Sequence, residues 1–232
     1  MTTPSSGPDP KDLERVAQAA LRLVADGMTL GLGTGRAAEA FIEALGTRAR
    51  GGLRVRGVPT SNRSDALARR LNIEVVSLQE IDRLDIAFDG ADEVTPDLQL
   101  TKGLGGALLR ERVVAHEAER FVVLVTPEKL VDKLGTRTPI PIEVVPFAVP
   151  TVTRHFAKLG GKAAPRKKAD GFPFITDNQN WILDTDFGPI DDPVALDAAV
   201  RKIPGVVDTG IFLGMADVVL VGETGAVKEL RR

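Results

Sequence analysis

The chain has 232 residues, with 30 Lys and Arg against 32 Asp and Glu, so its formal net charge is −2. This balance gives no electrostatic reason to expect a nucleic acid or an anionic membrane as partner. The chain contains no cysteine, which excludes disulfides, thiolate nucleophiles and iron–sulfur clusters, and its 2 histidines argue against a histidine-rich metal site.

No apolar run approaches the roughly 20 residues that a membrane-spanning helix needs. The first ten residues, MTTPSSGPDP, lack the apolar stretch of a secretory signal and predict a disordered tail. We therefore expect a cytoplasmic protein with no membrane partner.

From Asp12 onward, helical patterns alternate with short apolar runs. Strands are predicted at 28–32, 53–58, 73–76, 84–88 and 121–125, and helices at 12–24, 37–45, 62–70 (capped by Ser61) and 107–117. This alternation predicts an α/β fold, in which helices cover both faces of a mostly parallel sheet. In such sheets, ligands bind beyond the carboxyl ends of the strands.

The alternation stops near residue 135. Two β-prone runs, 172–177 and 181–186, flank a polar turn and predict a hairpin, and helices are expected at 151–159 and 193–203. The apolar run 216–221 is expected to rejoin the first sheet. The sequence therefore predicts a first domain of residues 1–134 plus 212–232, and an inserted small α+β domain of residues 135–211 that provides an oligomer contact.

A glycine turn, Gly31-Leu-Gly33-Thr-Gly35-Arg36, joins the first strand to the next helix. Backbone N–H groups at such a turn, together with the positive end of the helix, form an anion site. Arg36 stands where a dinucleotide fingerprint needs its third glycine, so a small phosphate monoester fits better. A tight connection that binds nothing is an equally weighted interpretation of this motif alone.

The segment Asp89-Gly-Ala-Asp92-Glu93 follows the buried strand 84–88. Carboxylates at a sheet crevice orient sugar hydroxyls, transfer protons or hold a divalent cation. A solvated acidic loop is the common alternative. Metal binding is the minority interpretation, because no histidine is near and Lys102 follows closely.

Lys102 opens a second glycine turn, KGLGG, which precedes a helix that carries Glu111. The lysine and the backbone N–H groups resemble a device that stabilises a developing oxyanion. A shielded Glu111 would act as a proton-shuttling base. An exposed Glu, favoured near a helix start by the helix dipole, is the alternative that we weight more heavily on local sequence alone.

The remaining candidates carry weaker signals. Lys129 follows a strand end but is otherwise an ordinary surface lysine. His116 and His155 are expected to be structural or exposed, and the basic run 166–168 is expected to be soluble surface. An anion cradle, two aspartates, a lysine with glycine donors and a glutamate together suit cofactor-free aldose–ketose isomerisation of a phosphorylated sugar.

The chain closely resembles the ribose-5-phosphate isomerases of the A type. The matching blocks run in order from about residue 13 to 222: GLGTGRAAEAF, PTSNRSDALARRLNI, DIAFDGADEVTPDLQLTKGLGGALLRERVVA, EKLVDKLG, PIPIEVVPFA, TDNQNWILD and IPGVVDTGIF. The resemblance implies interconversion of D-ribose 5-phosphate and D-ribulose 5-phosphate in the pentose phosphate pathway, without a metal or other cofactor. It also implies a Rossmann-like domain with an inserted ferredoxin-like domain, assembled as a homodimer or homotetramer.

By position, the resemblance implies a catalytic set and a substrate-binding set. The catalytic set is Glu111 as the base, Asp89 and Asp92 as the hydroxyl-binding and ring-opening aspartates, with Asp89 expected to assist opening of the furanose ring, and Lys102 at the oxyanion. The substrate-binding set is the phosphate turn Thr34, Gly35, Arg36 and Ala37, then Gly90 and Ala91, the oxyanion turn Gly103, Leu104 and Gly105, and Lys129.

The chain departs from the family pattern in its phosphate turn, which is commonly TGST and here is TGRA. Arg36 is expected to replace the missing hydroxyls with a charged contact to phosphate. Leu104 replaces a glycine, and the family's N-terminal lysine has no secure counterpart, since Lys11 and Arg15 are unaligned. Two other classes of function rank below the isomerase: a sugar-phosphate sensor domain and a CoA-transferase-like enzyme.

Overall fold

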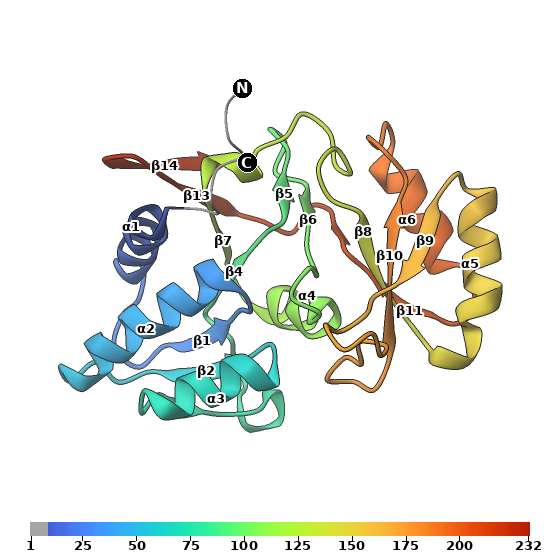
Figure 1. Cartoon of the computed structure of the whole chain (residues 1–232). Helices are drawn as coiled ribbons and strands as arrows, with labels where there is room; N and C mark the ends of the chain where they lie inside the picture. The colour runs from blue at the N-terminus through green and yellow to red at the C-terminus, as the bar shows by residue number, and fades with distance from the viewer. Residues whose placement is uncertain (1–8) are drawn as a thin grey trace.

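The computed structural model describes residues 9–232, and its centre is a seven-stranded sheet (Figure 1). The strand order is β14-β13-β7-β4-β1-β2-β3, and every neighbouring pair is parallel except β13 and β14. The strands are β1 (Thr29–Leu32), β2 (Arg56–Pro59), β3 (Glu74–Val75), β4 (Ile86–Gly90), β7 (Phe121–Val125), β13 (Val218–Glu223) and β14 (Ala226–Arg231). The mostly parallel α/β sheet is confirmed, and β13 rejoins it as predicted.

Helices cover both faces of this sheet because its strands are apolar on both sides. Leu30, Phe88 and Leu124 share one buried core with the helices on their face. Ala87 and Val123 belong to a second core on the opposite face. The helices are α1 (Pro10–Leu21), α2 (Arg36–Arg50) and α3 (Asn62–Arg70) on the first face, and α4 (Leu108–Glu117) on the second.

Local capping explains where two of these helices begin. Asp9 accepts a hydrogen bond from the N–H of Lys11 and Pro10 takes the first helical position, so the predicted disordered tail is wrong for residues 9 and 10. Residues 1–8 of that predicted tail lie outside the described part of the chain. Ser61 caps α3 as predicted, in a reciprocal pair with Ser64.

A second sheet is antiparallel throughout and has the order β11-β8-β10-β9. Its elements follow the chain as β8 (Ile140–Val144), α5 (Val149–Lys158), β9 (Lys162–Pro165), β10 (Trp181–Asp186), α6 (Pro193–Arg201) and β11 (Val206–Thr209). This βαββαβ connectivity is ferredoxin-like, so the inserted α+β unit is confirmed. We call residues 140–209 the small unit; the exact domain boundaries at 134/135 and 211/212 stay a prediction.

The predicted hairpin of 172–177 with 181–186 is confirmed only at its turn, where the N–H of Thr176 donates to the carbonyl oxygen of Asn180, and is wrong for the rest of the two runs. The antiparallel partner of β10 is β9, whereas the segment 172–177 makes only isolated bridges, such as that of Ile175 with Trp181. Pro173 lacks an N–H to donate, and the side chain of Thr176 binds the buried carboxylate of Glu143. The polar residues of this segment therefore form a loop and not a strand.

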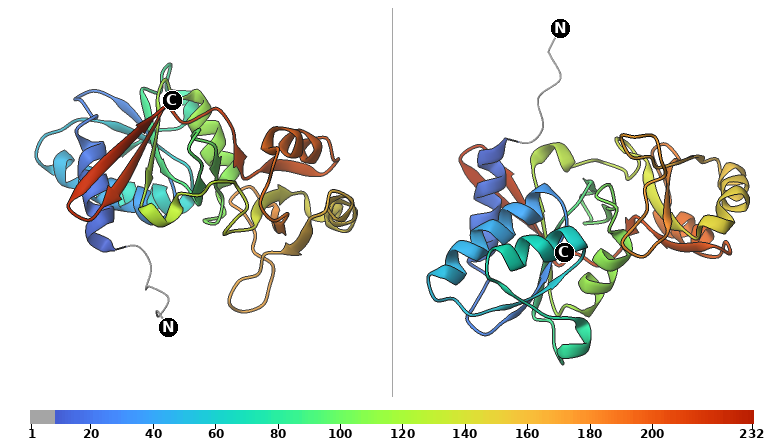
Figure 2. Two further views of the ribbon diagram at one scale, coloured as in Figure 1. Left: turned by 90° about the horizontal axis from the view of Figure 1, so that it is seen from above. Right: turned by 60° about the horizontal axis from the view of Figure 1, so that its bottom comes forward.

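A short three-stranded sheet connects the two larger sheets. It consists of β12 (Ile211–Phe212), β6 (Leu100–Thr101) and β5 (Glu93–Val94). Beside it, the N–H of Lys102 donates to the carbonyl oxygen of Gly210 at 2.9 Å. The views in Figure 2 show α4, in green, between the central sheet and the small unit.

Short 3-10 turns occupy Leu78–Glu80, Pro127–Lys129 and Pro146–Ala148. No helix within residues 9–232 is long and apolar enough to cross a membrane.

Candidate active site

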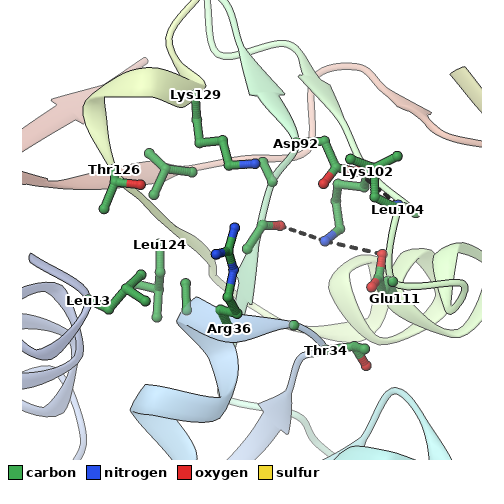
Figure 3. A pocket seen from close by; sticks show the side chains of 17 residues that line it. Leu13, Thr34, Arg36, Asp92, Lys102, Leu104, Glu111, Leu124, Thr126 and Lys129 are labelled. Carbon is green, nitrogen blue, oxygen red and sulfur yellow. Dashed lines mark hydrogen bonds and ion pairs between the residues drawn. The ribbon is translucent and has the colours of Figure 1, made fainter. Parts of the chain in front are cut away.

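A pocket of about 230 Å³ opens where β1, β4 and β7 end (Figure 3). Every predicted site residue lines it except Asp89, which lies directly behind its wall. The lining residues are Leu13, Thr34, Gly35, Arg36, Ala37, Gly90, Ala91, Asp92, Lys102, Gly103, Leu104, Gly105, Glu111, Leu124, Val125, Thr126 and Lys129. Motifs that are up to 95 residues apart in the sequence, from Thr34 to Lys129, therefore meet at one edge of the sheet.

The first wall of the pocket is the turn into α2. Gly35 adopts φ 101° as the N-cap residue of α2, and its lack of a side chain leaves the first backbone N–H groups of the helix without a side-chain cap. Arg36 and Ala37 are the first two residues of that helix. In Figure 3 the side chains of Arg36 and Lys129 extend toward one another across the pocket, which brings two positive charges to this end.

The turn 33–35 that leads into α2 packs directly against Asp89. A Cβ on Gly33 would lie 2.3 Å from Cγ of Asp89, so only glycine permits this approach. The N–H groups of Thr34 and Gly90 donate to Oδ1 of Asp89 at 3.0 and 2.7 Å. Asp89 therefore fixes the position of the turn.

Lys102 sits at the centre of a buried cluster. Its Nζ lies 3.1 Å from Oδ2 of Asp89 and 3.2 Å from Oε2 of Glu111, and it donates to the carbonyl oxygen of Gly90 at 2.6 Å. The three side chains are at most 3 % exposed. The structure thus contradicts both local alternatives, the solvated acidic loop for Asp89 and the exposed first-turn glutamate for Glu111.

Burial changes the proton affinities of this cluster. Loss of hydration raises the pKa of Glu111 to about 8; Lys102 opposes the rise, and the charges of Asp89 and Asp92 add to it. Burial likewise raises the pKa of Asp89. Burial disfavours the charged form of Lys102, but the surrounding carboxylates outweigh it and raise its pKa to about 12. Lys102 thus stays cationic, whereas Glu111 exchanges a proton near neutral pH.

The second glycine turn faces Asp92. Gly103 adopts φ 101°, and the N–H of Leu104 donates to Oδ2 of Asp92 at 2.9 Å. Burial raises the pKa of Asp92, against the attraction of its hydrogen bond to Leu104 and of nearby cations. Unlike Asp89, Asp92 contributes directly to the pocket wall.

The helix α4 that carries Glu111 is anchored on both sides of this residue. Arg110 donates to Oδ1 of Asn178 at 2.9 Å. Arg112 pairs with Asp208 at 2.7 Å and donates to the carbonyl oxygens of Thr209 and Ile211 at 2.7 and 2.9 Å. Both arginines therefore bind the small unit, and Arg112 also binds Ile211 just beyond it. Together they fix the orientation of α4.

Sequence patterns miss four lining residues: Leu13, Leu124, Val125 and Thr126. Leu13 belongs to the apolar stripe that predicts the first helix. Lys11 is exposed and Arg15 pairs with Asp12, so Leu13 is the residue of α1 that reaches the pocket.

The two histidines are exposed and lie outside the pocket, as expected. Arg166 is not soluble surface: it binds the second glycine turn.

Within the described part of the chain, no three His, Cys, Asp or Glu side chains gather as a metal site would require. The acidic groups of the pocket instead surround the ammonium group of Lys102. Lys102 therefore supplies a positive charge to these carboxylates.

Comparison with known proteins identifies the family. The family model of ribose 5-phosphate isomerase A (phosphoriboisomerase A) matches residues 56–225. The chain belongs to this family. The ribose-5-phosphate isomerase A of Thermomicrobium roseum is 49% identical over 94% of this chain and 93% of the relative, and that of Nitrobacter hamburgensis is 46% identical over 95% and 97%.

Solved structures of the family share the whole fold. The ribose 5-phosphate isomerase A of Methanocaldococcus jannaschii has a TM-score of 0.92 at 46% identity, over 97% of this chain and 100% of that chain. A D-ribose-5-phosphate isomerase in complex with phospho-erythronic acid has a TM-score of 0.93 at 41% identity, over 96% and 98%. The family membership decides for the isomerase over the sensor and CoA-transferase alternatives.

Proposed function

We propose that this pocket interconverts D-ribose 5-phosphate and D-ribulose 5-phosphate, with Glu111 as the proton-shuttling base. The protein is an isomerase of the ribose-5-phosphate isomerase A family. The observation that carries the role of Glu111 is its position: a buried carboxylate at the pocket wall, 3.2 Å from the ammonium group of Lys102. A base and an electrophile in contact are what proton transfer next to a carbonyl requires.

Substrate orientation follows from the two ends of the pocket. The phosphate is proposed to bind the N–H groups at the start of α2 with Arg36 and Lys129, because these supply the positive charge. The reacting carbons then lie near Glu111, Lys102 and the second glycine turn at the other end. One small pocket thus recognises both a phosphate and an enediolate.

The proposed reaction keeps its atoms in balance. In the open-chain aldose, Glu111 takes the proton from carbon 2, and the electron pair shifts to the carbonyl oxygen on carbon 1 to form an enediolate. Lys102 and the N–H groups of the turn 103–105 stabilise that oxygen. Glu111 returns its proton to carbon 1, and the hydroxyl proton moves from oxygen 2 to oxygen 1, which gives the ketose.

Ring opening is reassigned on the basis of the geometry. The sequence predicts that Asp89 assists it, but Asp89 does not line the pocket and its carboxylate binds Thr34, Gly90 and Lys102. We assign proton exchange with the ring oxygen to Asp92, which lines the pocket and whose pKa is raised by burial. Asp89 then holds Lys102 and the phosphate turn in place.

The pathway, the compartment and the assembly are inferred more coarsely. A ribose 5-phosphate isomerase serves the interconversion of pentose phosphates, and we place this chain in that metabolism in the cytoplasm. We further propose a homodimer or homotetramer, with the small unit as the contact. Phe147 in this unit is 96 % exposed, and burial of its ring against another protein surface would be favourable.

The test of the base is an assay with ribose 5-phosphate after chelator treatment, in which ketose formation is followed for wild type and Glu111→Gln. We expect rapid turnover by wild type and a loss of about 10³-fold in kcat for Glu111→Gln, since a positioned base contributes about 10²–10⁴-fold. The matched control is Glu117→Gln, an exposed glutamate on the same helix. Loss of less than tenfold for Glu111→Gln would refute the assignment.

A further inference from the structure

Arg166 follows β9 in the small unit and reaches across to the second glycine turn. Its Nη1 donates to the carbonyl oxygens of Gly103 and Leu104, both at 2.9 Å. Arg166 is not among the residues that line the pocket. Any influence on the reaction therefore has to pass through the backbone of the turn.

The guanidinium group of Arg166 is itself held rigidly. Asp184 on β10 binds it in a two-pronged ion pair, with Nε–Oδ2 at 2.9 Å and Nη2–Oδ1 at 2.5 Å. The guanidinium group also lies 5.8 Å from the ring of Phe174, which covers Gly106 so closely that a Cβ there would be 2.4 Å from the ring. The Arg166 side chain is only 13 % exposed.

Peptide geometry carries this constraint to the pocket side of the turn. In a trans peptide the C=O and the N–H point in opposite directions, and the described chain has no cis peptide bond. Holding the carbonyls of Gly103 and Leu104 therefore turns the N–H groups of Leu104 and Gly105 away from Arg166. The Leu104 N–H donates to Asp92, while the Gly105 N–H has no acceptor among residues 9–232 and belongs to the pocket lining.

We propose that Arg166, fixed by Asp184, is a positioning residue that orients and polarises the Gly105 N–H as an oxyanion donor, and holds the Leu104 N–H on Asp92. A charged donor on a carbonyl oxygen draws electron density from the peptide and makes its N–H a stronger donor. The inference rests on the proposed isomerisation and adds to it that the small unit takes part in catalysis. It predicts that Arg166 matters most when negative charge is present at this turn.

The kinetic test uses Arg166→Met, which keeps the length of the side chain but removes its donors. We expect kcat for ribose 5-phosphate to fall by about 10- to 100-fold while KM changes by less than about threefold, because the donors act mainly on the developing oxyanion. Arg166→Lys keeps the charge but not the planar fork, and should recover only part of the loss. Lys167→Met, an exposed neighbour, is the control.

The binding test separates positioning from a merely structural role. Phospho-erythronic acid presents a carboxylate together with a phosphate, whereas erythritol 4-phosphate has the phosphate alone. Calorimetry should show that Arg166→Met weakens binding of the acid about tenfold and binding of the alcohol less than about twofold. Asp184→Asn should change the same ratio in the same direction, by a smaller factor.

Two outcomes would overturn the proposal. Equal weakening of both ligands would mean that Arg166 only holds the fold together, and unchanged binding of the acid would mean that it has no effect on the turn. Thermal melts of each variant show whether the fold survives. The proposed function fails separately, by the absence of ketose formation from wild type, since the ligand ratio is measured without turnover.

Discussion

Glu111 and Lys102 form a buried acid–base pair, and the pKa values of both groups are raised. Burial raises the pKa of Glu111 to about 8, and the carboxylates around Lys102 raise its pKa to about 12. Lys102 therefore remains a fixed positive charge across the working pH range. Of this pair, Glu111 is the group that changes its protonation, which is the property that a proton shuttle needs.

The pH dependence of the rate follows from the pKa of Glu111. The base acts in its ionised form, so kcat/KM should rise about tenfold per pH unit below the pKa and level off above about pH 8. A profile measured between about pH 6 and 9 with ribose 5-phosphate checks this. Glu117→Gln should leave the profile unchanged. A flat profile over this range would contradict a base with a raised pKa.

Arg36 occupies the position in the phosphate turn where the sequence resemblance leads us to expect a hydroxyl residue. Its side chain extends into the pocket beside Lys129 (Figure 3). We expect Arg36→Ala to raise KM for ribose 5-phosphate about tenfold, which corresponds to about 1.4 kcal/mol for a lost charged hydrogen bond. Arg48→Ala, exposed near the other end of α2, is the control. An unchanged KM for Arg36→Ala would exclude Arg36 from phosphate binding.

Whole elements are positioned by contacts that a linear pattern does not display. In helix α4, Glu111 lies in the first turn, between Arg110, which binds the loop at Asn178, and Arg112, which binds Asp208. The proposed base Glu111 is therefore positioned by distant contacts: Asn178 lies 68 residues from Arg110 in the chain, and Asp208 lies 96 residues from Arg112. The helix can be predicted from local sequence, but its orientation depends on the small unit.

The cap of α3 also braces the phosphate turn. Ser61 accepts the N–H of Ser64 at 3.1 Å and the hydroxyl of Thr34 at 2.8 Å. Ser61→Ala should lower the free energy of unfolding by about 1 kcal/mol, a Tm decrease of about 2–4 °C for a chain of this size. Ser77→Ala removes an exposed hydroxyl that donates to Glu80 at the start of a 3-10 turn, and should cost less than half of this. Equal shifts in calorimetry would show that Thr34 gains nothing from Ser61.

The elements that sequence patterns identify are those with strong burial on both faces. The run FVVLV predicts a strand at 121–125, and β7 has the same bounds. The edge strand β14 escapes prediction because its side chains are largely exposed and charged, so that no apolar alternation marks it. The strand β9 escapes prediction because its side chains are mostly exposed and its alanines and proline are uncommon in strands, and without it the sequence assigns β10 to the segment 172–177 as its main partner.

The sequence predicts more of the site than of its surroundings. The turns that follow β1, β4 and β7 converge because parallel strands end at one edge of a sheet, and glycines beside acids and a lysine mark those turns. The depth at which Glu111 lies is not predictable, because burial depends on elements that fold over it from elsewhere. Leu13 and Thr126 carry no chemical signal of their own, and only the assembled pocket shows them.

At the scale of the whole molecule, the site lies where three sheets meet. The central sheet supplies the phosphate turn and Asp92, the short sheet supplies Lys102, and the small unit supplies Arg166 to the turn 103–105. Figure 1 shows the chain crossing from the central sheet to the small unit and back beside β6. The return passes through Gly210, which accepts the N–H of Lys102.

Gly210 has no room for a side chain at this crossing. A Cβ would lie 2.4 Å from the carbonyl oxygen of Lys102 and 2.9 Å from that of Pro141, so backbone would have to move. Gly210→Ala should destabilise the fold by about 1–3 kcal/mol, the usual cost of overpacking. Because the displaced atoms belong to Lys102, kcat should also fall at temperatures where the variant is fully folded.

The matched control is Gly225→Ala. Gly225 adopts φ 85°, and a Cβ there would have no atom within 4 Å, so alanine introduces backbone strain without a clash. Melting curves and turnover at about 25 °C separate the two effects: both variants should lose stability, and only Gly210→Ala should lose activity. Full activity in folded Gly210→Ala would show that Lys102 tolerates displacement of its own backbone, and that the cluster around its ammonium group is what fixes it.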